Sequence, residues 1–121
     1  MSTKNLRDKK CIPCEGGVPA LSKQAVGDFI GHIDKHWKVR EEHSRLFMSV
    51  KTKDFAHSML IAQRIGKMAD DQWHHPVLTI GFGQLDIEVW THKINGLVES
   101  DFIFASKVDQ ILGEDSSVIF Q

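Results

Sequence analysis

The sequence of 121 residues lacks a long hydrophobic run and has almost no net charge. No apolar segment approaches the roughly 18 residues that a bilayer span needs, which argues against an integral membrane protein. Residues 1–7 also lack the apolar stretch of a secretory signal, so we expect a cytoplasmic protein. The formal net charge of −1 gives no reason to expect nucleic acid or a membrane surface as a partner.

Cysteine is scarce as well, with Cys11 and Cys14 forming a CxxC motif. Such a motif can be a redox dithiol or half of a zinc site. The redox motif normally follows a strand and begins a helix, but here a charged segment precedes it and a glycine pair follows. A zinc site would need a second pair of ligands nearby. We therefore expect residues 1–20 to be an N-terminal arm and residues 21–121 to be a single domain.

Hydrophobic periodicity predicts three helices in this domain. Apolar residues recur at the spacing of one helical face over residues 22–34, about 54–70 and 99–112. Ser22 is a good N-cap for the first helix, and Thr52 or Asp54 can cap the second. His57 falls on the second helix, where we expect it at the surface.

A period of two predicts four strands that form two hairpins. The first hairpin pairs residues 37–39 with 46–50, and the second pairs 78–82 with 85–91 about a tight turn at residues 83–84. The order of elements is α-β-β-α-β-β-α. This order predicts an α+β fold, with a four-stranded antiparallel sheet and helices packed on one face.

Three of the seven histidines lie close together around the second hairpin. His74 and His75 precede the third strand, and His92 ends the fourth. Imidazole exchanges protons near neutral pH, so the cluster predicts a proton-transfer site, with a metal site as the alternative. Adjacent residues of an extended chain point to opposite faces, so His74 and His75 cannot readily share one ion. A metal would need one of them together with His92 and a carboxylate.

The predicted hairpin brings residues distant in sequence together. Positions 75 and 92 are symmetric about the turn residues 83 and 84, so His75 should lie opposite His92. Asp70 would end the second helix and Asp101 would begin the third, near the same end of the hairpin. A carboxylate there can orient an imidazole or bind a polar edge of a substrate. The pattern predicts a cleft lined by histidine and aspartate, without defining its reaction.

The combined pattern resembles the pterin-4a-carbinolamine dehydratases, also called 4a-hydroxytetrahydrobiopterin dehydratases. Its central motif is Asp70-x3-His74-His75-Pro76, then Thr91-His92-x3-Gly96-Leu97, then Asp101. The resemblance extends over residues 11–112 and includes Trp37, Arg45-Leu46-Phe47, Lys53-Asp54-Phe55 and the segment that begins at Cys11. The family often has Ser or Thr as a helix cap three residues before the aspartate. This chain has Val98 there, so Glu99 or Ser100 would cap the helix instead.

The resemblance implies a reaction, in which a 4a-hydroxytetrahydropterin loses water to give the quinonoid dihydropterin. It implies acid-base catalysis by His74 and His92, without assigning which is the acid, and a role for His75 in positioning the pterin. The same resemblance implies that the histidines or the ring are oriented by Asp70, Asp101, Trp37 and Trp90. It implies neither a metal nor a cofactor, since the pterin is the substrate.

The resemblance also implies partners. We expect a homodimer or homotetramer, and a functional link to aromatic amino-acid hydroxylases, whose tetrahydrobiopterin-type cofactor would be recycled. Two other roles stay open at this point. Animal members of the family act as dimerisation cofactors for a homeodomain transcription factor, and a role in molybdenum-cofactor metabolism would also use a pterin. The near-neutral charge of the chain argues against direct contact with nucleic acid.

Overall fold

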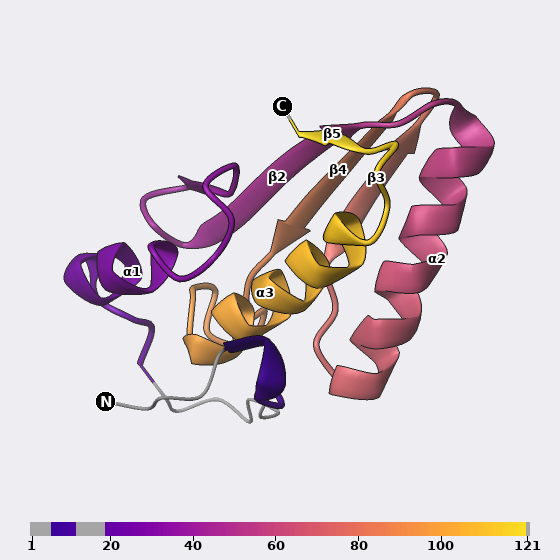
Figure 1. Cartoon of the computed structure of the whole chain (residues 1–121). Helices are drawn as coiled ribbons and strands as arrows, with labels where there is room; N and C mark the ends of the chain where they lie inside the picture. The colour runs from indigo at the N-terminus through magenta and orange to yellow at the C-terminus, as the bar shows by residue number, and fades with distance from the viewer. Residues whose placement is uncertain (1–5, 12–18, 121) are drawn as a thin grey trace.

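The computed structural model describes residues 6–11 and 19–120, so the prediction for Cys14 falls outside the described residues. Its helices are a short 3-10 helix η1 (Leu6–Asp8), α1 (Lys23–Ile30), α2 (Phe55–Gln72) and α3 (Glu99–Gly113). Its strands are β1 (Lys38–Arg40), β2 (Arg45–Lys51), β3 (Val77–Gly81), β4 (Gln84–Val89) and β5 (Ile119–Phe120). Figure 1 shows α2 and α3 lying along the sheet, and the two helices contact each other.

The α+β class and the antiparallel sheet are confirmed, but the sheet contains one strand more than predicted. The strand order is β1-β2-β4-β3, and β5 pairs with Val50 and Lys51 of β2. Because β4 occupies one side of β2, β5 lies on the same side of β2 as β1. β5 spans only two residues, which is too short for a period of two to reveal it.

The core lies between the helices and one face of the sheet. Every second residue of the two central strands is fully buried there, namely Leu46, Met48, Val50, Leu85, Ile87 and Val89. The residues between them, such as Phe47 and Asp86, are half-buried on the opposite face. The helices complete the core with large side chains such as Phe102 and Phe104 of α3. The alternation that predicted these strands therefore also identified their buried face.

The predicted register of the second hairpin is wrong by two residues. The turn consists of Phe82 and Gly83, and β3 pairs Gly81 with Gln84 and Val77 with Glu88. Gly83, the second residue of this turn, has a φ of 76°, a left-handed conformation that glycine adopts without steric cost. Extending this pairing would place position 90, rather than position 92, opposite position 75.

The starts of α1 and α2 agree with the predicted caps. The Ser22 hydroxyl accepts a hydrogen bond from the Ala25 N–H at 3.2 Å, and the Asp54 carboxylate accepts one from the His57 N–H at 2.8 Å. α1 is shorter than predicted, because it ends at Ile30 with Gly31 as its C-cap. Ile33 lies beyond this end and is still buried in the core, which explains its place in the apolar pattern.

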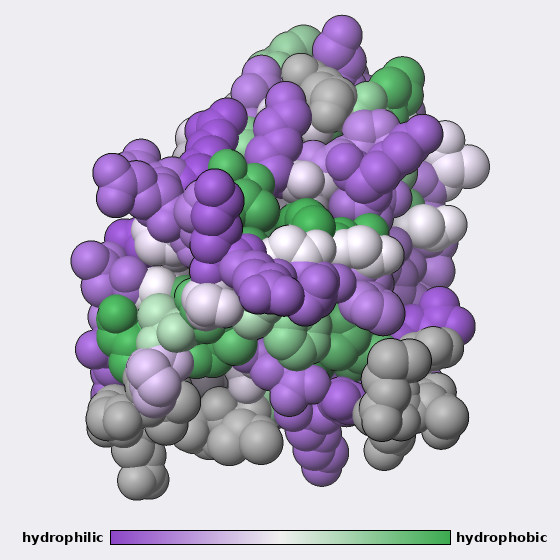
Figure 2. Space-filling model, turned by 90° about the vertical axis from the view of Figure 1, so that its left-hand side faces the viewer, coloured by the Kyte–Doolittle hydropathy of each residue, from purple (hydrophilic) through white to green (hydrophobic). Residues whose placement is uncertain are grey.

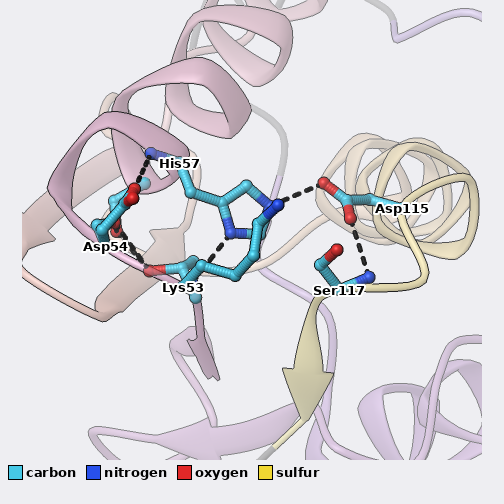
Figure 3. A network of polar contacts seen from close by, with 7 residues as sticks. Lys53, Asp54, His57, Asp115 and Ser117 are labelled. Atoms are coloured by element: carbon cyan, nitrogen blue, oxygen red, sulfur yellow. Dashed lines mark hydrogen bonds and ion pairs between the residues drawn. The ribbon is translucent and has the colours of Figure 1, made fainter.

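His57 is buried, so its predicted surface position is wrong. The Lys53 N–H donates to His57 Nδ1 at 2.9 Å, which leaves the ring proton on Nε2 to donate to Asp115 Oδ2 at 2.7 Å (Figure 3). Asp115 also accepts a hydrogen bond from the Ser117 N–H at 2.9 Å. This network joins the start of α2 to the turn between α3 and β5, and we interpret it as structural.

The side of the molecule that is on the left of Figure 1 is largely hydrophilic. Figure 2 shows this side, with hydrophobic residues gathered in a band across its lower half. Among residues 6–11 and 19–120, no helix combines the length and the hydropathy that crossing a membrane requires.

Candidate active site

The end of α2 directs His74 into the protein. Trp73, the C-cap, adopts a left-handed conformation with a φ of 53°, and the His74 N–H then bonds to the Ala69 carbonyl at 3.2 Å. As a result, Trp73 is 76% exposed whereas His74 is only 8% exposed. Its imidazole also packs against Phe104 of α3, with the ring centroids 5.7 Å apart.

Asp101 is the centre of the site and is completely buried. Its Oδ1 lies 2.6 Å from His74 Nε2, while its Oδ2 accepts hydrogen bonds from the Thr91 hydroxyl at 2.9 Å and the Val98 N–H at 2.8 Å. Asp101 stands in the first turn of α3, where the helix dipole favours a carboxylate. The pairing of Asp101 with His74 had no signal in the sequence beyond the presence of a carboxylate nearby.

α3 starts at Glu99 as predicted, but its N-cap differs from the prediction. Val98 is the N-cap residue, and Glu99 and Ser100 already belong to the helix. Asp101 meets the need for a cap from inside the helix, because its carboxylate accepts the Val98 N–H. Valine at the cap position is therefore compatible with a firmly held Asp101.

The hydrogen bonds of Asp101 define the proton positions on His74. A carboxylate can only accept, so His74 Nε2 carries a proton and donates it to Oδ1. The other nitrogen, Nδ1, then has a free lone pair in the neutral ring. A carboxylate that orients an imidazole and stabilises its protonated form is the arrangement that prepares a histidine to act as a base.

His75 points to solvent, on the side of the chain away from His74. Its Nε2 lies 2.9 Å from Asp70 Oδ1, and the two side chains are 53% and 80% exposed. An ion pair this exposed contributes little to stability. The predicted pairing of a histidine with Asp70 thus occurs, but at the surface of the molecule.

His92 follows β4 and is exposed, with its ring stacked on the Trp90 indole. The two ring centroids are 4.3 Å apart and the ring planes differ by 4°. Its neighbour Thr91 is buried and bonded to Asp101. Asp101 therefore connects His74 to the segment that carries His92. The two segments are joined by this carboxylate and not by the predicted contact of His75 with His92.

Trp37 is held in a different environment from the histidines. It is buried, and its indole N–H donates to Asp109 Oδ1 at 2.7 Å. Asp109 Oδ2 also accepts the Asp34 N–H at 2.8 Å, yet burial raises the pKa of this carboxyl to about 6. The contacts of Trp37 fix α3 to the segment before β1 and bring no group of Trp37 to the His74–Asp101 pair.

The described part of the N-terminal arm packs beside this site. The Cys11 N–H donates to Gln72 Oε1 at the end of α2, and the thiol donates to the Ser100 carbonyl at 3.4 Å. Burial raises the pKa of the Cys11 thiol to about 11, so it keeps its proton at neutral pH. The described residues contain no group of three or more His, Cys, Asp or Glu side chains arranged to hold a metal ion.

The sequence of this α+β domain matches that of a known protein family. A family described as pterin 4 alpha carbinolamine dehydratase matches residues 19–111. A relative from Rickettsia bellii that carries the family's name is 46% identical over 107 residues, which are 88% of this chain and 94% of the relative. A relative from Methylococcus capsulatus is 34% identical, over 94% of this chain and 99% of its own. The chain belongs to the pterin-4a-carbinolamine dehydratase family, whose members are lyases.

A crystal structure also shares the fold. It is described as a transcriptional coactivator/pterin dehydratase from Brucella melitensis and superposes with a TM-score of 0.70. The two sequences are 24% identical, and the match covers 76% of this chain and 97% of the other. At this identity the likeness shows the common fold alone.

Proposed function

We propose that this chain removes water from a 4a-hydroxytetrahydropterin to give the quinonoid dihydropterin. The buried His74–Asp101 pair, bonded through Thr91 to the segment of His92, is the observation that carries the proposal. Membership of the dehydratase family supports the choice of substrate. The pterin itself is the substrate, and both transferred protons can pass through side chains, so we propose that no cofactor or metal takes part.

The reaction breaks the bond between C4a and its hydroxyl and removes the proton from N5. Hydroxide is a poor leaving group, so a general acid must protonate it as it departs as water. We propose His74 as the base at N5, because Asp101 holds its Nε2–H and would stabilise the imidazolium that forms. His92 then acts as the acid. Each well-placed group of this kind typically contributes about 10²–10⁴-fold to the rate.

His75 and Asp70 form the exposed part of the proposed site. Their side chains are joined at 2.9 Å, and the imidazole is more than half exposed. We propose that His75 binds a polar edge of the pterin and that Asp70 orients the imidazole of His75. Loss of either group should therefore weaken substrate binding more than it slows the chemical step.

The chemistry of the substrate and product indicates which reactions come before and after this one. An enzyme that oxygenates a tetrahydropterin, such as an aromatic amino-acid hydroxylase, would supply the substrate, and a reductase would consume the product. We propose that this chain recycles the pterin in the cytoplasm.

β3 is an outer strand that pairs with β4 on one side, and such an edge can pair with a second copy. We therefore propose a homodimer or homotetramer.

An assay of dehydration tests this function. Freshly prepared 4a-hydroxytetrahydropterin is mixed with the parent protein, with H74A, with H92A and with the control H32A, which changes an exposed histidine just after α1. We expect each site variant to lose about 10²–10⁴-fold in rate and the control to match the parent. Parental rates in both H74A and H92A would refute acid-base catalysis by these residues. A parent protein no faster than the spontaneous reaction would refute the dehydratase function.

A further inference from the structure

A side chain from another strand holds the loop that carries His92. His92 lies between Trp90, the residue after β4, and Asn95, in the following turn. Arg45, the first residue of β2, contacts both. The pairing of Leu46 with Val89 places Arg45 directly beside Trp90 across the two strands. Arg45 thus contacts the chain on each side of His92.

The guanidinium of Arg45 is fixed by all of its contacts together. Its central carbon lies 4.1 Å from the centroid of the Trp90 ring, and Nη2 donates to Asn95 Oδ1 at 2.6 Å. Nη1 donates to the Ser44 carbonyl at 2.9 Å and to the Ser44 hydroxyl at 3.1 Å. A planar group with several donors can stack and form these hydrogen bonds at the same time, which an ammonium group cannot.

Trp90 in turn sets the plane of the His92 ring. The two rings are nearly parallel, with their centroids 4.3 Å apart. In the part of the chain that the structure describes, the His92 imidazole forms no hydrogen bond, so this stacking is the contact that orients it. An exposed imidazole without this contact would sample several rotamers.

The backbone of the loop is held by hydrogen bonds that do not involve the His92 ring. Its base is closed by the bridge between Thr91 and Gly96, whose two backbone hydrogen bonds measure 2.9 and 3.4 Å. Its tip contains Asn95 with a φ of 51°, a left-handed conformation that asparagine tolerates better than most residues. The Ile94 and Asn95 N–H groups also donate to the Thr91 and His92 carbonyls at 3.3 Å, and the bond from Arg45 to the Asn95 side chain joins this turn to β2.

We infer that Arg45 is a positioning residue, which holds Trp90 and Asn95 and thereby fixes the His92 imidazole for proton transfer. The inference rests on the proposed function for the role of His92 in the reaction. It also gives Trp90 a definite task, because its indole face is occupied by His92 rather than by the pterin. The effect of Arg45 on catalysis is exerted through these two neighbours.

The first test is an NMR measurement on the free protein. Protons of an imidazole stacked on an indole are shifted upfield by its ring current, which reports the His92 geometry without any substrate. We expect W90L to abolish this shift, R45Q and R45K to reduce it by half or more, and W90F to keep part of it. The matched control is R40Q, because Arg40 makes the same kind of contact with Phe47, at 3.5 Å, beside no histidine of the site.

The second test is the kinetics of dehydration by the same variants. A misplaced catalytic group slows the chemical step, so we expect R45Q and R45K to lower kcat by about tenfold while KM stays within about twofold. We expect W90L to lower kcat more than W90F does, because phenylalanine keeps a flat ring on which His92 can stack. R40Q should match the parent in kcat and in the ring-current shift.

Two results would overturn the inference. One is an unchanged ring-current shift of His92 in R45Q, and the other is a raised KM with parental kcat in R45Q or W90L, which would place these residues on the substrate. Amide spectra of each variant, compared away from residues 90–96, show whether the fold is retained. If the parent protein has no dehydratase activity, the proposed function fails, while the NMR comparison still decides whether Arg45 positions His92.

Discussion

Replacing Asp101 with asparagine changes the proton positions on His74 while leaving the shape of the side chain almost unchanged. The carboxylate accepts three hydrogen bonds, one at Oδ1 from His74 and two at Oδ2 from Thr91 and Val98. Asparagine has one oxygen and one NH₂ group. Its oxygen will satisfy the two donors at the Oδ2 position, so the NH₂ group will face His74 Nε2.

This orientation forces His74 Nε2 to become an acceptor. The ring proton must then move to Nδ1, which removes the lone pair that we propose takes the proton from N5. Losing a general base costs about 10²–10⁴-fold, so we expect D101N to lower kcat by at least about 10²-fold. All three hydrogen bonds of the buried carboxylate lose their charge assistance, so we expect a loss of about 2 kcal/mol in the free energy of unfolding.

Three measurements check this prediction in the same variant. ¹⁵N chemical shifts of the His74 ring report the tautomer, stopped-flow dehydration reports kcat, and urea unfolding reports stability. The control for stability is D70N, because the Asp70–His75 pair is exposed and its loss should cost less than about 1 kcal/mol. A parental rate in D101N with the proton on Nδ1 would refute His74 as the base. A proton that stays on Nε2 would refute the hydrogen-bond scheme itself.

Three further predictions concern stability. Burial raises the pKa of Asp109 to about 6, so the folded protein binds the proton of this carboxyl more tightly than the unfolded chain does. The free energy of unfolding should therefore fall by up to about 3 kcal/mol as the pH rises from about 4 to 6. Urea unfolding across this range should show a flatter dependence in D109N, and an unchanged slope would contradict the assignment. H57A removes a buried imidazole and leaves the Lys53 N–H without its acceptor, so we expect a cost of about 1–3 kcal/mol in urea unfolding. A loss below about 0.5 kcal/mol would show that the network in Figure 3 is dispensable. In G96A the new Cβ would lie 2.8 Å from Ala20 Cβ, so we expect a lower Tm, whereas G66A meets nothing within 4 Å and should raise it; the opposite order would contradict the packing.

Local patterns predicted the elements of the fold but not how they meet. The alternation along β4 correctly put Leu85, Ile87, Val89 and Thr91 on one face and Trp90 on the other. A period of two cannot detect a register shift of two residues, because both registers bury the same side chains. The observed pairing of Gly81 with Gln84 places Gly83 second in the turn rather than first, and glycine at either position looks the same in the sequence.

The contacts of the site depend on which strands are neighbours. The prediction of two hairpins left the pairing of β2 with β4 undetermined, and this pairing places Arg45 beside Trp90. The burial of His57 could not be predicted from local patterns, because its partner Asp115 is 58 residues away in the sequence. The histidines and Asp101 were identifiable from their spacing. Their pairing follows from the packing of the end of α2 against the start of α3.

The most direct test of the proposed chemistry is the conversion of freshly prepared 4a-hydroxytetrahydropterin to quinonoid dihydropterin, followed by stopped-flow absorbance with and without the protein. We predict that the parent chain accelerates this conversion above the spontaneous rate in the same buffer. We also predict that the double variant H74A/H92A, shown to unfold cooperatively, returns the rate to the spontaneous one. Acceleration that survives the loss of both histidines, or no acceleration by the parent chain, would contradict acid-base dehydration at this site.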